Sequence, residues 1–455
     1  MEQKTTRYID YVKEKTAEIN EVSPTFCLAK WVQSTVLLYN GSTHSCHHPE
    51  RHKIKAEDIS VNHHGLHNTP VKMKARKEML EGKQTAECDY CWNIENLGKN
   101  HTSDRIYKSL FSWSYPRFQE VLDSGLGEKF IPSYLEIAFD TACNLKCVYC
   151  NPESSSSWES EINKFGAVPQ VPTALYDLGY LKRTGGLPIP QEAHNPYIEA
   201  FWKWWPELYQ KVRVLRVTGG EPLMSPHTWR LMDRLQEGSR EDFNFSINTN
   251  LCVPDHMIER LITKINSMSS RLEAFDVYTS LESVGAQAEY TRFGMNYEKF
   301  RHNCDHLLAS TPEKTRLTFM TTIGILSAPS FTGFLEFIAE LRSRYRLGDG
   351  KFRINTSFNY LRWPHCLSLG LLPPELKKKY GSEWISLVEK SPAFYAEEVD
   401  QIKRLVDFMN AANPPMKDYE NFRLYMKAMD ERRNLNFLET FPELALLIDD
   451  NYFNL

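Results

Sequence analysis

From about residue 130 onward, apolar runs typical of buried strands alternate with helical stretches, and few architectures accommodate such an alternation. The strand-like runs are residues 134–139, 213–217, 243–247, 274–278, 316–323 and 353–358. Helical spacing of apolar residues predicts helices at 226–237, 255–268, 296–309 and 330–345. Strands separated by helices build parallel sheets, so the sequence predicts an α/β fold whose sheet is closed or partly closed into a barrel.

Three cysteines, Cys143, Cys147 and Cys150, follow the first of these strands at the spacing C-x3-C-x2-C. In a parallel α/β barrel the reactive groups lie at the C-terminal ends of strands, which is where this loop falls. Three thiolates can hold three irons of a 4Fe-4S cluster and leave the fourth iron open to another ligand. Structural core cysteines are the poorer interpretation, because polar residues such as Asn144 and Lys146 flank them.

A second set of cysteines lies in the first 100 residues, a segment rich in Cys, His and Trp. Cys27 and Cys46 are widely spaced, whereas Cys88 and Cys91 form a C-x2-C pair. A predicted hairpin, with its turn at the Asn-Gly dipeptide 40–41, returns Cys46 toward Cys27. Four thiolates suit a tetrahedral site, for which zinc and an iron–sulfur cluster are both chemically possible.

Other potential ligands receive simpler interpretations. Histidines of the N-terminal segment compete as ligands, but for each one a surface or supporting role is expected; they are His44, His47, His48, His52, His63, His64 and His67. The remaining cysteines, Cys252, Cys304 and Cys366, are expected to be buried among apolar side chains.

Composition narrows the functional classes. A net charge of −4 gives no electrostatic reason to expect nucleic acid as the main partner, and the basic run at 71–80 is typical of a solvated helix face. The N-terminus lacks the apolar core of a secretory signal, and no run approaches the about 18 apolar residues of a membrane span. We therefore expect a cytoplasmic protein with no membrane partner, whose ten cysteines are metal or catalytic ligands rather than disulfides.

The cysteine loop, together with the Thr-Gly-Gly-Glu-Pro turn at 218–222 after the second strand, resembles the radical S-adenosylmethionine (SAM) superfamily over residues 130–365. The resemblance implies a partial (β/α)6 TIM-like barrel and an enzyme that cleaves SAM reductively. SAM would bind at the open iron of a 4Fe-4S cluster, and the resulting 5′-deoxyadenosyl radical would abstract hydrogen from a substrate. The protein's part would be to supply position and to exclude water.

The resemblance also implies which residues contact SAM. Gly219, Gly220 and Glu221, followed by Pro222, correspond to the contact with the SAM amino group, where backbone must approach closely and glycine allows it. The other implied contacts are Asn248 on the ribose side, Ser280 and Glu282 after the fourth strand, and Arg292 opposite the SAM carboxylate. For these last four residues, capping, a turn or surface charge is the alternative.

The four N-terminal cysteines resemble the auxiliary-cluster half of SPASM and twitch domains, although those domains usually follow the barrel and this module precedes it. The resemblance implies a twitch-type module with one auxiliary cluster, of the 4Fe-4S rather than the 2Fe-2S type. The expected domains are a Cys/His-rich module at 1–125, a radical SAM barrel at 126–370 and a helical C-terminal extension at 371–455. Nothing in that extension suggests chemistry.

Three functions follow from these features. The first is a radical SAM enzyme that acts on a peptide or a small molecule, receives electrons from a donor such as flavodoxin or ferredoxin, and uses the auxiliary cluster to bind substrate or remove an electron. The second is radical modification of a nucleotide or RNA, for which the basic helix Lys72-Lys74-Arg76-Lys77 is the support. The third is a zinc-stabilised binding protein without catalysis, which leaves the three-cysteine loop and the glycine turn unexplained.

Overall fold

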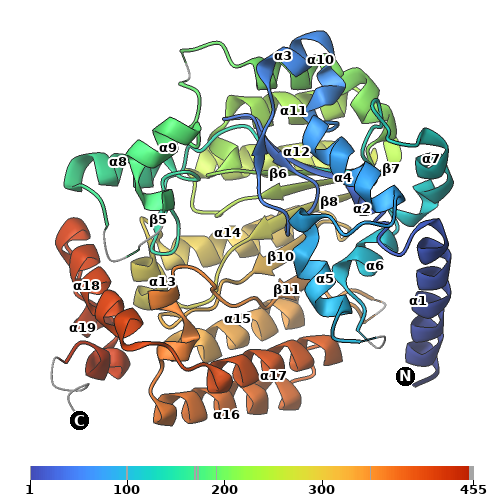
Figure 1. Cartoon of the computed structure of the whole chain (residues 1–455). Helices are drawn as coiled ribbons and strands as arrows, with labels where there is room; N and C mark the ends of the chain where they lie inside the picture. The colour runs from blue at the N-terminus through green and yellow to red at the C-terminus, as the bar shows by residue number, and fades with distance from the viewer. Residues whose placement is uncertain are drawn as a thin grey trace. The chain divides into compact units, whose positions relative to one another are not determined.

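The computed structural model describes residues 2–98, 101–168, 171, 174–190, 192–348 and 350–449, and of residues 2–9 the backbone alone. The chain forms two compact units, each assembled from separate stretches. Unit 1 comprises Met1–Asp140, Pro188–Thr218 and Asp242–Phe245, and unit 2 comprises Thr141–Leu187, Gly219–Glu241 and Ser246–Leu455. Both units mix helices with mostly parallel strands (Figure 1), which confirms the predicted α/β class.

Unit 1 holds the N-terminal elements and two later ones. They are α1 (Glu2–Val22), α2 (Ala29–Val32), β1 (Gln33–Leu37), β2 (Ser42–His44), β3 (His52–Lys53), α3 (Ala56–Val61), η1 (His63–Leu66), α4 (Pro70–Leu80), η2 (Ala86–Cys88), α5 (Asp89–Glu95), α6 (Asp104–Ser109), η3 (Tyr115–Arg117), α7 (Phe118–Ser124), β4 (Tyr134–Ala138), α10 (Pro196–Lys211) and β6 (Val214–Thr218), where η marks a 3-10 helix. Its strands lie in the order β3-β2-β1-β4-β6. β1, β4 and β6 run parallel, whereas β2 and β3 are antiparallel to their neighbours.

The predicted N-terminal hairpin is present in unit 1. β1 turns into β2 through Gly41, whose φ of +70° suits glycine. An added Cβ at Gly41 would also lie 2.0 Å from the ring of Tyr197, so no larger residue fits. Because β1 pairs with β4 as well as with β2, the N-terminal segment shares a sheet with the first predicted strand. The domain boundaries expected after residues 125 and 370 stay a prediction.

The sequence predicts that the basic run at 71–80 is a solvated helix face, but helix α4 is solvated on one side only. Lys74 and Lys77 are exposed, but Lys72 and Arg76 are fully buried. The Nζ of Lys72 donates to hydroxyls of β1 and β2 at 2.8 and 2.9 Å, and Arg76 donates to three backbone carbonyls. Residues four apart share one side of a helix, so half of the basic run packs inward and leaves no continuous basic surface.

Unit 2 holds the remaining elements. They are β5 (Lys146–Cys147), α8 (Ser156–Phe165), η4 (Ala174–Tyr176), α9 (Leu178–Thr184), η5 (Pro222–Met224), α11 (Pro226–Gln236), α12 (Asp255–Met268), β8 (Leu272–Thr279), α13 (Gly285–Thr291), β9 (Arg292–Phe293), α14 (Tyr297–Ser310), β10 (Arg316–Met320), η6 (Ala328–Ser330), α15 (Phe331–Arg344), β11 (Ile354–Ser357), η7 (His365–Leu367), η8 (Leu369–Leu371), α16 (Pro374–Lys390), α17 (Ala396–Ala411), α18 (Met416–Arg433), α19 (Phe437–Thr440) and η9 (Pro442–Leu447). β7 (Arg240–Asn248) has residues in both units. β8, β10 and β11 are parallel, and the two-residue strands β5 and β9 pair antiparallel.

The six predicted strands and four predicted helices are all present, to within three residues of their expected bounds. The strand predicted at 316–323 stops at Met320, and Ile323 pairs separately with Tyr360. Regular periodicity explains the agreement, since α12, for example, buries Ile258, Leu261 and their neighbours at helical spacing. In the part of the chain that the structure describes, no helix combines the length and the apolar character that a membrane span needs.

A buried ion pair joins three elements of unit 2, in the region where α15, α16 and α17 lie one beside the next (Figure 1). Arg342 of α15 donates two hydrogen bonds of 2.7 Å to the carboxylate of Glu398 in α17. Its Nε donates to the carbonyl of Ile354 in β11 at 3.0 Å. Both charged side chains are buried, so each needs the other as a counter-charge.

We expect Glu398→Gln to lower the free energy of unfolding by about 3 kcal/mol, because it leaves the Arg342 charge buried without a carboxylate. Urea unfolding measures the loss. Glu389→Gln is the matched control, since Glu389 forms a half-exposed pair with Lys403 at 2.7 Å, and its loss should be far smaller. Equal losses in the two variants would contradict the role given to the buried pair.

Candidate functional site

Unit 2 brings together the three cysteines of the loop after residue 140. Burial, together with the negative charge of a neighbouring Cys147 thiolate, raises the pKa of Cys143 and of Cys150 to about 12. Burial also raises the pKa of Cys147, against the positive charge of Arg292. The three thiols therefore lie close enough to influence one another's ionisation. Metal binding would displace the protons from these thiols.

Side chains from outside the loop hold its backbone in place. Three loop carbonyls accept hydrogen bonds: Cys147 from Trp158 Nε1 at 2.8 Å, Val148 from Tyr425 Oη at 2.6 Å, and Lys146 from Arg433 Nη1 at 2.9 Å. The N–H of Val148 donates to the carbonyl of Thr291 at 2.8 Å and continues the β5–β9 ribbon. These contacts hold the backbone of the loop in place from Lys146 to Val148.

Two of these side chains come from α18, in the extension where the sequence suggested no chemistry. Arg433 also forms a fully buried ion pair with Glu161 of α8, at 3.1 Å, and its guanidinium lies 4.9 Å from the ring of Trp158. Burial by itself raises the pKa of Glu161, but Arg433 and Lys146 together bring it below its usual value. Sequence periodicity predicts the helix, but no local signal connects Tyr425 to a loop 277 residues earlier.

The Gly-Gly-Glu-Pro turn packs directly on the cysteine loop. The N–H of Glu221 donates to the carbonyl of Ala142 at 2.6 Å. An added Cβ at Gly220 would lie 2.4 Å from the Ala142 oxygen and 2.5 Å from the Thr141 oxygen, closer than real side chains approach. Gly219 is exposed and has a φ of +133°. The two motifs therefore meet backbone to backbone, and an exposed glycine backbone beside the thiols fits a cofactor amino group.

The Glu221 side chain is turned inward. Its Oε1 accepts from the N–H of Leu223 at 3.0 Å and its Oε2 from the N–H of Asn250 at 2.7 Å. Burial raises the pKa of Glu221 to about 7, although those two N–H groups oppose the shift. The side-chain amide of Asn250 donates in turn to Asn144 Oδ1 at 2.8 Å, inside the cysteine loop. The carboxylate thus braces the turn, and Pro222, buried at the start of η5, continues it.

Glu282 and Arg292, both expected to contact SAM, pair with each other next to Cys147. Arg292 Nη2 lies 2.7 Å from Glu282 Oε2, and Tyr149 Oη donates to Glu282 Oε1 at 3.0 Å. Arg292 Nη1 lies 3.7 Å from the Cys147 sulfur. Among the described residues, Arg292 Nε is buried and has no hydrogen-bond partner, so this one donor is left for a bound group. A contact between Arg292 and the SAM carboxylate stays a prediction.

Three further residues lie at or near strand ends of unit 2. Asn248 is the last residue of β7 and Ser280 directly follows β8; both are half-buried, and their contact with SAM stays a prediction. Cys252 differs from its expected apolar burial, because it is half-buried and its carbonyl accepts from Asn144 Nδ2 at 3.0 Å. Cys304 and Cys366 are buried, as expected.

Unit 1 gathers the four N-terminal cysteines around one cavity. Cys27, Cys46, Cys88 and Cys91 all line it. Burial, together with the negative charge of the other three thiolates, raises the pKa of Cys27 to about 12. Burial likewise raises the pKa of Cys88, to about 11. Four interacting thiols around a single cavity fit a tetrahedral thiolate site.

Cations surround the same cavity. Lys30, Arg105 and Lys108 line it, and Lys30 is almost fully buried beside Glu87. Burial lowers the pKa of Lys30, but the charges of Cys88 and Glu87 outweigh burial and raise it above its usual value. A metal centre with four thiolates is negatively charged, and these cations would offset that charge. Zinc and an iron–sulfur cluster fit this donor set equally well.

Most histidines of this segment do not line the four-cysteine cavity. Among the described residues, His48 alone of them lines the cavity, and its Nε2 lies 2.7 Å from Asp104 Oδ2. Other histidines form local hydrogen bonds: His44 with the Cys46 carbonyl, His52 with Thr69 Oγ1, and His67 with the Trp31 carbonyl. His63 and His64 approach Glu207 instead.

No protein-family model matches the chain, and no curated protein matches it either. Among solved structures it is similar to SuiB of Streptococcus suis, determined alone, bound to S-adenosylmethionine, and bound to the precursor peptide SuiA. The identities are 14%, 14% and 15%, the TM-scores are 0.31, 0.32 and 0.32, and each match covers 80% of this chain and 70% of the SuiB chain. Similarity at this level does not assign a function, so a function for this chain has to be argued from its own residues.

Gly220→Ala is expected to destabilise the chain by about 1–3 kcal/mol and to reduce the iron bound after reconstitution, because the new Cβ pushes the turn off the cysteine loop. Thermal unfolding and iron analysis measure the two effects. Gly348→Ala is the control, since an added Cβ there meets no described atom within 4 Å. If Gly220→Ala bound as much iron as Gly348→Ala, the contact would not matter for the site.

Arg433→Met should lower the free energy of unfolding by about 3 kcal/mol and loosen the cysteine loop, because Glu161 loses its buried partner and the Lys146 carbonyl loses a donor. Chemical unfolding and iron retention during gel filtration test this. The neighbouring Arg432→Met removes hydrogen bonds to the carbonyls of Gly166 and Ala167, at 3.1 and 2.8 Å, and a guanidinium 5.9 Å from the Phe165 ring, all outside the cysteine loop. Iron retention should survive in that variant, and a loss in both would argue against a specific role for Arg433.

Proposed function

We propose that this chain is a radical SAM enzyme with two iron–sulfur clusters. One 4Fe-4S cluster is held by the loop cysteines and binds SAM at its open iron; the auxiliary cluster, of the 4Fe-4S type, is held by the four cysteines of unit 1. The observation that carries the proposal is the packing of Gly219–Glu221 on the loop of Cys143, Cys147 and Cys150. A glycine turn packed this tightly on a loop of three cysteines, none of them in a disulfide, is not what a purely structural site requires.

The protein residues would position the cofactor. When bound, a 4Fe-4S cluster with SAM supplies one-electron cleavage of SAM and hydrogen abstraction from a substrate. The exposed backbone at Gly219 would accept the SAM amino group, and Arg292 Nε, buried and without a hydrogen-bond partner among the described residues, would donate to the SAM carboxylate. Glu221 and Asn250 would keep the turn rigid rather than touch the reacting atoms.

The proposed enzyme has a specific fold, substrate class and electron donor. We infer a partial six-stranded barrel, a twitch-type N-terminal module, and SAM contacts from Asn248, Ser280 and Glu282. The substrate would be a peptide or a small molecule, the electron donor a protein such as flavodoxin or ferredoxin, and the compartment the reducing cytoplasm. The auxiliary site would bind substrate or take up an electron, and its ring of cations suits a centre that changes charge.

The alternative of a zinc-stabilised binding protein is supported by the four-cysteine cavity of unit 1. The four-cysteine cavity fits zinc as well as iron, so a zinc-stabilised binding protein without catalysis accounts for unit 1. It does not account for the converging thiols and the glycine turn of unit 2. Modification of RNA loses its support, because Lys72 and Arg76 of the basic run are buried.

Replacement of Cys143, Cys147 and Cys150 by Ala tests the function directly. The wild-type chain, reconstituted anaerobically, should bind about eight irons, four for each cluster, and release 5′-deoxyadenosine from SAM with dithionite. The triple variant should lose about half of the iron and all SAM cleavage, while a Cys88→Ala, Cys91→Ala variant should keep SAM cleavage. Iron and sulfide analysis and chromatography of the nucleoside products supply the measurements.

Two outcomes would overturn the proposal. Zinc bound in place of iron, with no SAM cleavage, would favour the binding protein. SAM cleavage that persists in the triple variant would place the cofactor away from these cysteines.

A further inference from the structure

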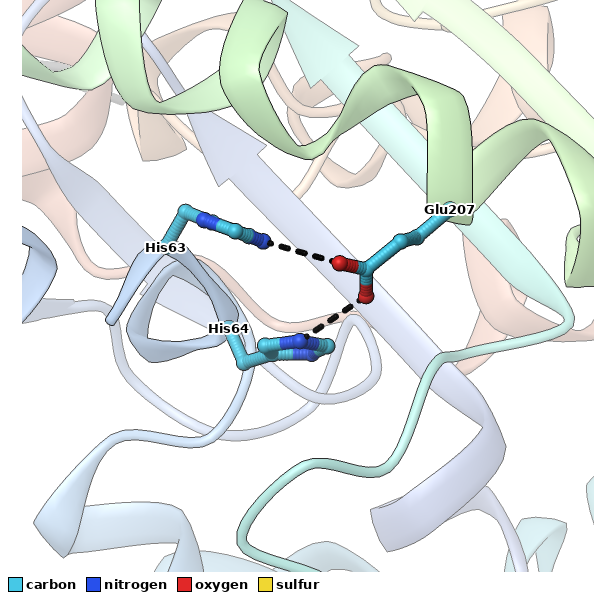
Figure 2. A group of neighbouring side chains, drawn as sticks. All are labelled: His63, His64 and Glu207. Atoms are coloured by element: carbon cyan, nitrogen blue, oxygen red, sulfur yellow. Dashed lines mark ion pairs between the residues drawn. The ribbon is translucent and has the colours of Figure 1, made fainter.

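Two adjacent histidines of unit 1 converge on one carboxylate. His63 Nε2 lies 3.5 Å from Oε1 of Glu207, and His64 Nε2 lies 3.0 Å from Oε2. Figure 2 shows both imidazole rings directed at the two carboxylate oxygens. One donor atom from each residue lies within 4.8 Å of the other two. None of these residues belongs to either cysteine site.

The local fold keeps the two rings in this position. His63 and His64 begin the 3-10 helix η1, which is capped by Asn62, whose Oδ1 accepts from His64 N at 3.1 Å. η1 packs against α3 and against α10, the helix that carries Glu207. The two imidazoles stack with centroids 4.9 Å apart, and the His64 ring meets the buried Trp204 ring edge-on at 5.6 Å. The three side chains are therefore arranged before any ligand binds.

The nitrogen atoms of this cluster are poorly satisfied. Among the described residues, His63 Nε2 and His64 Nδ1 are buried and have no hydrogen-bond partner. His64 is only 8% exposed, whereas the Glu207 side chain is 53% exposed, so the cluster is open on the carboxylate side. Leaving buried polar atoms unpaired costs stability, and such atoms call for a specific reason.

An ordinary ion pair does not explain the arrangement. Glu199 of the same helix forms such a pair at 2.6 Å with a single histidine, His194, which precedes the helix, and both side chains are exposed. At Glu207, a second imidazole shares the carboxylate, and two protonated rings 4.9 Å apart would repel each other. Neutral rings are instead good ligands for a metal ion, which gains from both nitrogens and the carboxylate together.

We propose that His63, His64 and Glu207 bind a divalent transition-metal ion, for which Zn²⁺ is the best match. Two imidazoles and one carboxylate form a known zinc donor set that leaves a fourth position for water. Each donor must lie about 2 Å from the ion, and donors already within 4.8 Å of one another reach it by small side-chain rotations. The bound ion would fasten η1 to α10 within unit 1.

The test uses the full chain with its cysteines first loaded with iron and sulfide, then freed of loose metal by a weak chelator and titrated with ZnSO₄ by calorimetry. Wild-type protein should bind one zinc ion, and Glu207→Gln should lose that ion or bind it at least about tenfold more weakly. Glu199→Gln is the matched control, because Glu199 lies on the same helix and pairs with a single exposed histidine. It should bind zinc as the wild type does.

A second variant guards against misfolding. His63 is less buried than His64, so its replacement disturbs the fold less. His63→Gln should also lose the ion, while the circular dichroism spectrum of each variant stays that of the wild type. Added zinc should raise the melting temperature of the wild type and of Glu199→Gln but not that of Glu207→Gln. The comparison does not require iron chemistry, so it remains valid if the radical SAM assignment fails.

Cobalt distinguishes this site from the cysteines. Co²⁺ in the proposed site should show no thiolate-to-metal charge-transfer absorption, whereas cobalt on cysteines would show it. Equal zinc binding by the wild type and Glu207→Gln, or cobalt spectra dominated by thiolate bands, would overturn the proposal.

Discussion

The close approach of Gly220 to the carbonyls of Thr141 and Ala142 is the contact on which the candidate cofactor site depends, because no side chain fits between them. It allows the N–H of Glu221 to reach Ala142, and the Glu221 carboxylate then anchors Asn250. Asn250 donates back to Asn144 within the cysteine loop. The turn, the loop and the end of β7 thus form a closed series of hydrogen bonds, in which each member holds the next.

The two cysteine sets lie in different electrostatic surroundings. Beside the three-cysteine loop, the positive charge of Arg292 is already paired with Glu282, so little of it remains to balance a metal centre. Around the four-cysteine cavity, Lys30, Arg105 and Lys108 are all close, and each has an acidic partner, Glu87, Glu95 and Asp104 respectively. Cations that already have carboxylate partners offset only part of the charge of a negative centre, in unit 1 as in unit 2.

Short-range patterns were enough to predict the regular elements, because apolar periodicity fixes which face of a strand or helix is buried. The same patterns predicted two cysteine sets, which the fold gathers as sets. They could not show that Lys72 packs inward, because a buried lysine is allowed only by hydroxyl partners on other strands. Nor could they reveal Arg433 or the meeting of His64 with Glu207, since both depend on contacts distant in sequence.

The fastening of the cysteine loop by α18 has a consequence for biosynthesis. Arg433 follows Lys146 by 287 residues, so the loop carbonyls have no partner from α18 until the ribosome has made that helix. At about 5–20 residues per second, that interval lasts about 15–60 s after the three cysteines emerge. During this interval the three thiols belong to a loop whose backbone lacks its C-terminal partners. A cluster of the kind proposed would therefore be inserted into the finished chain, after translation.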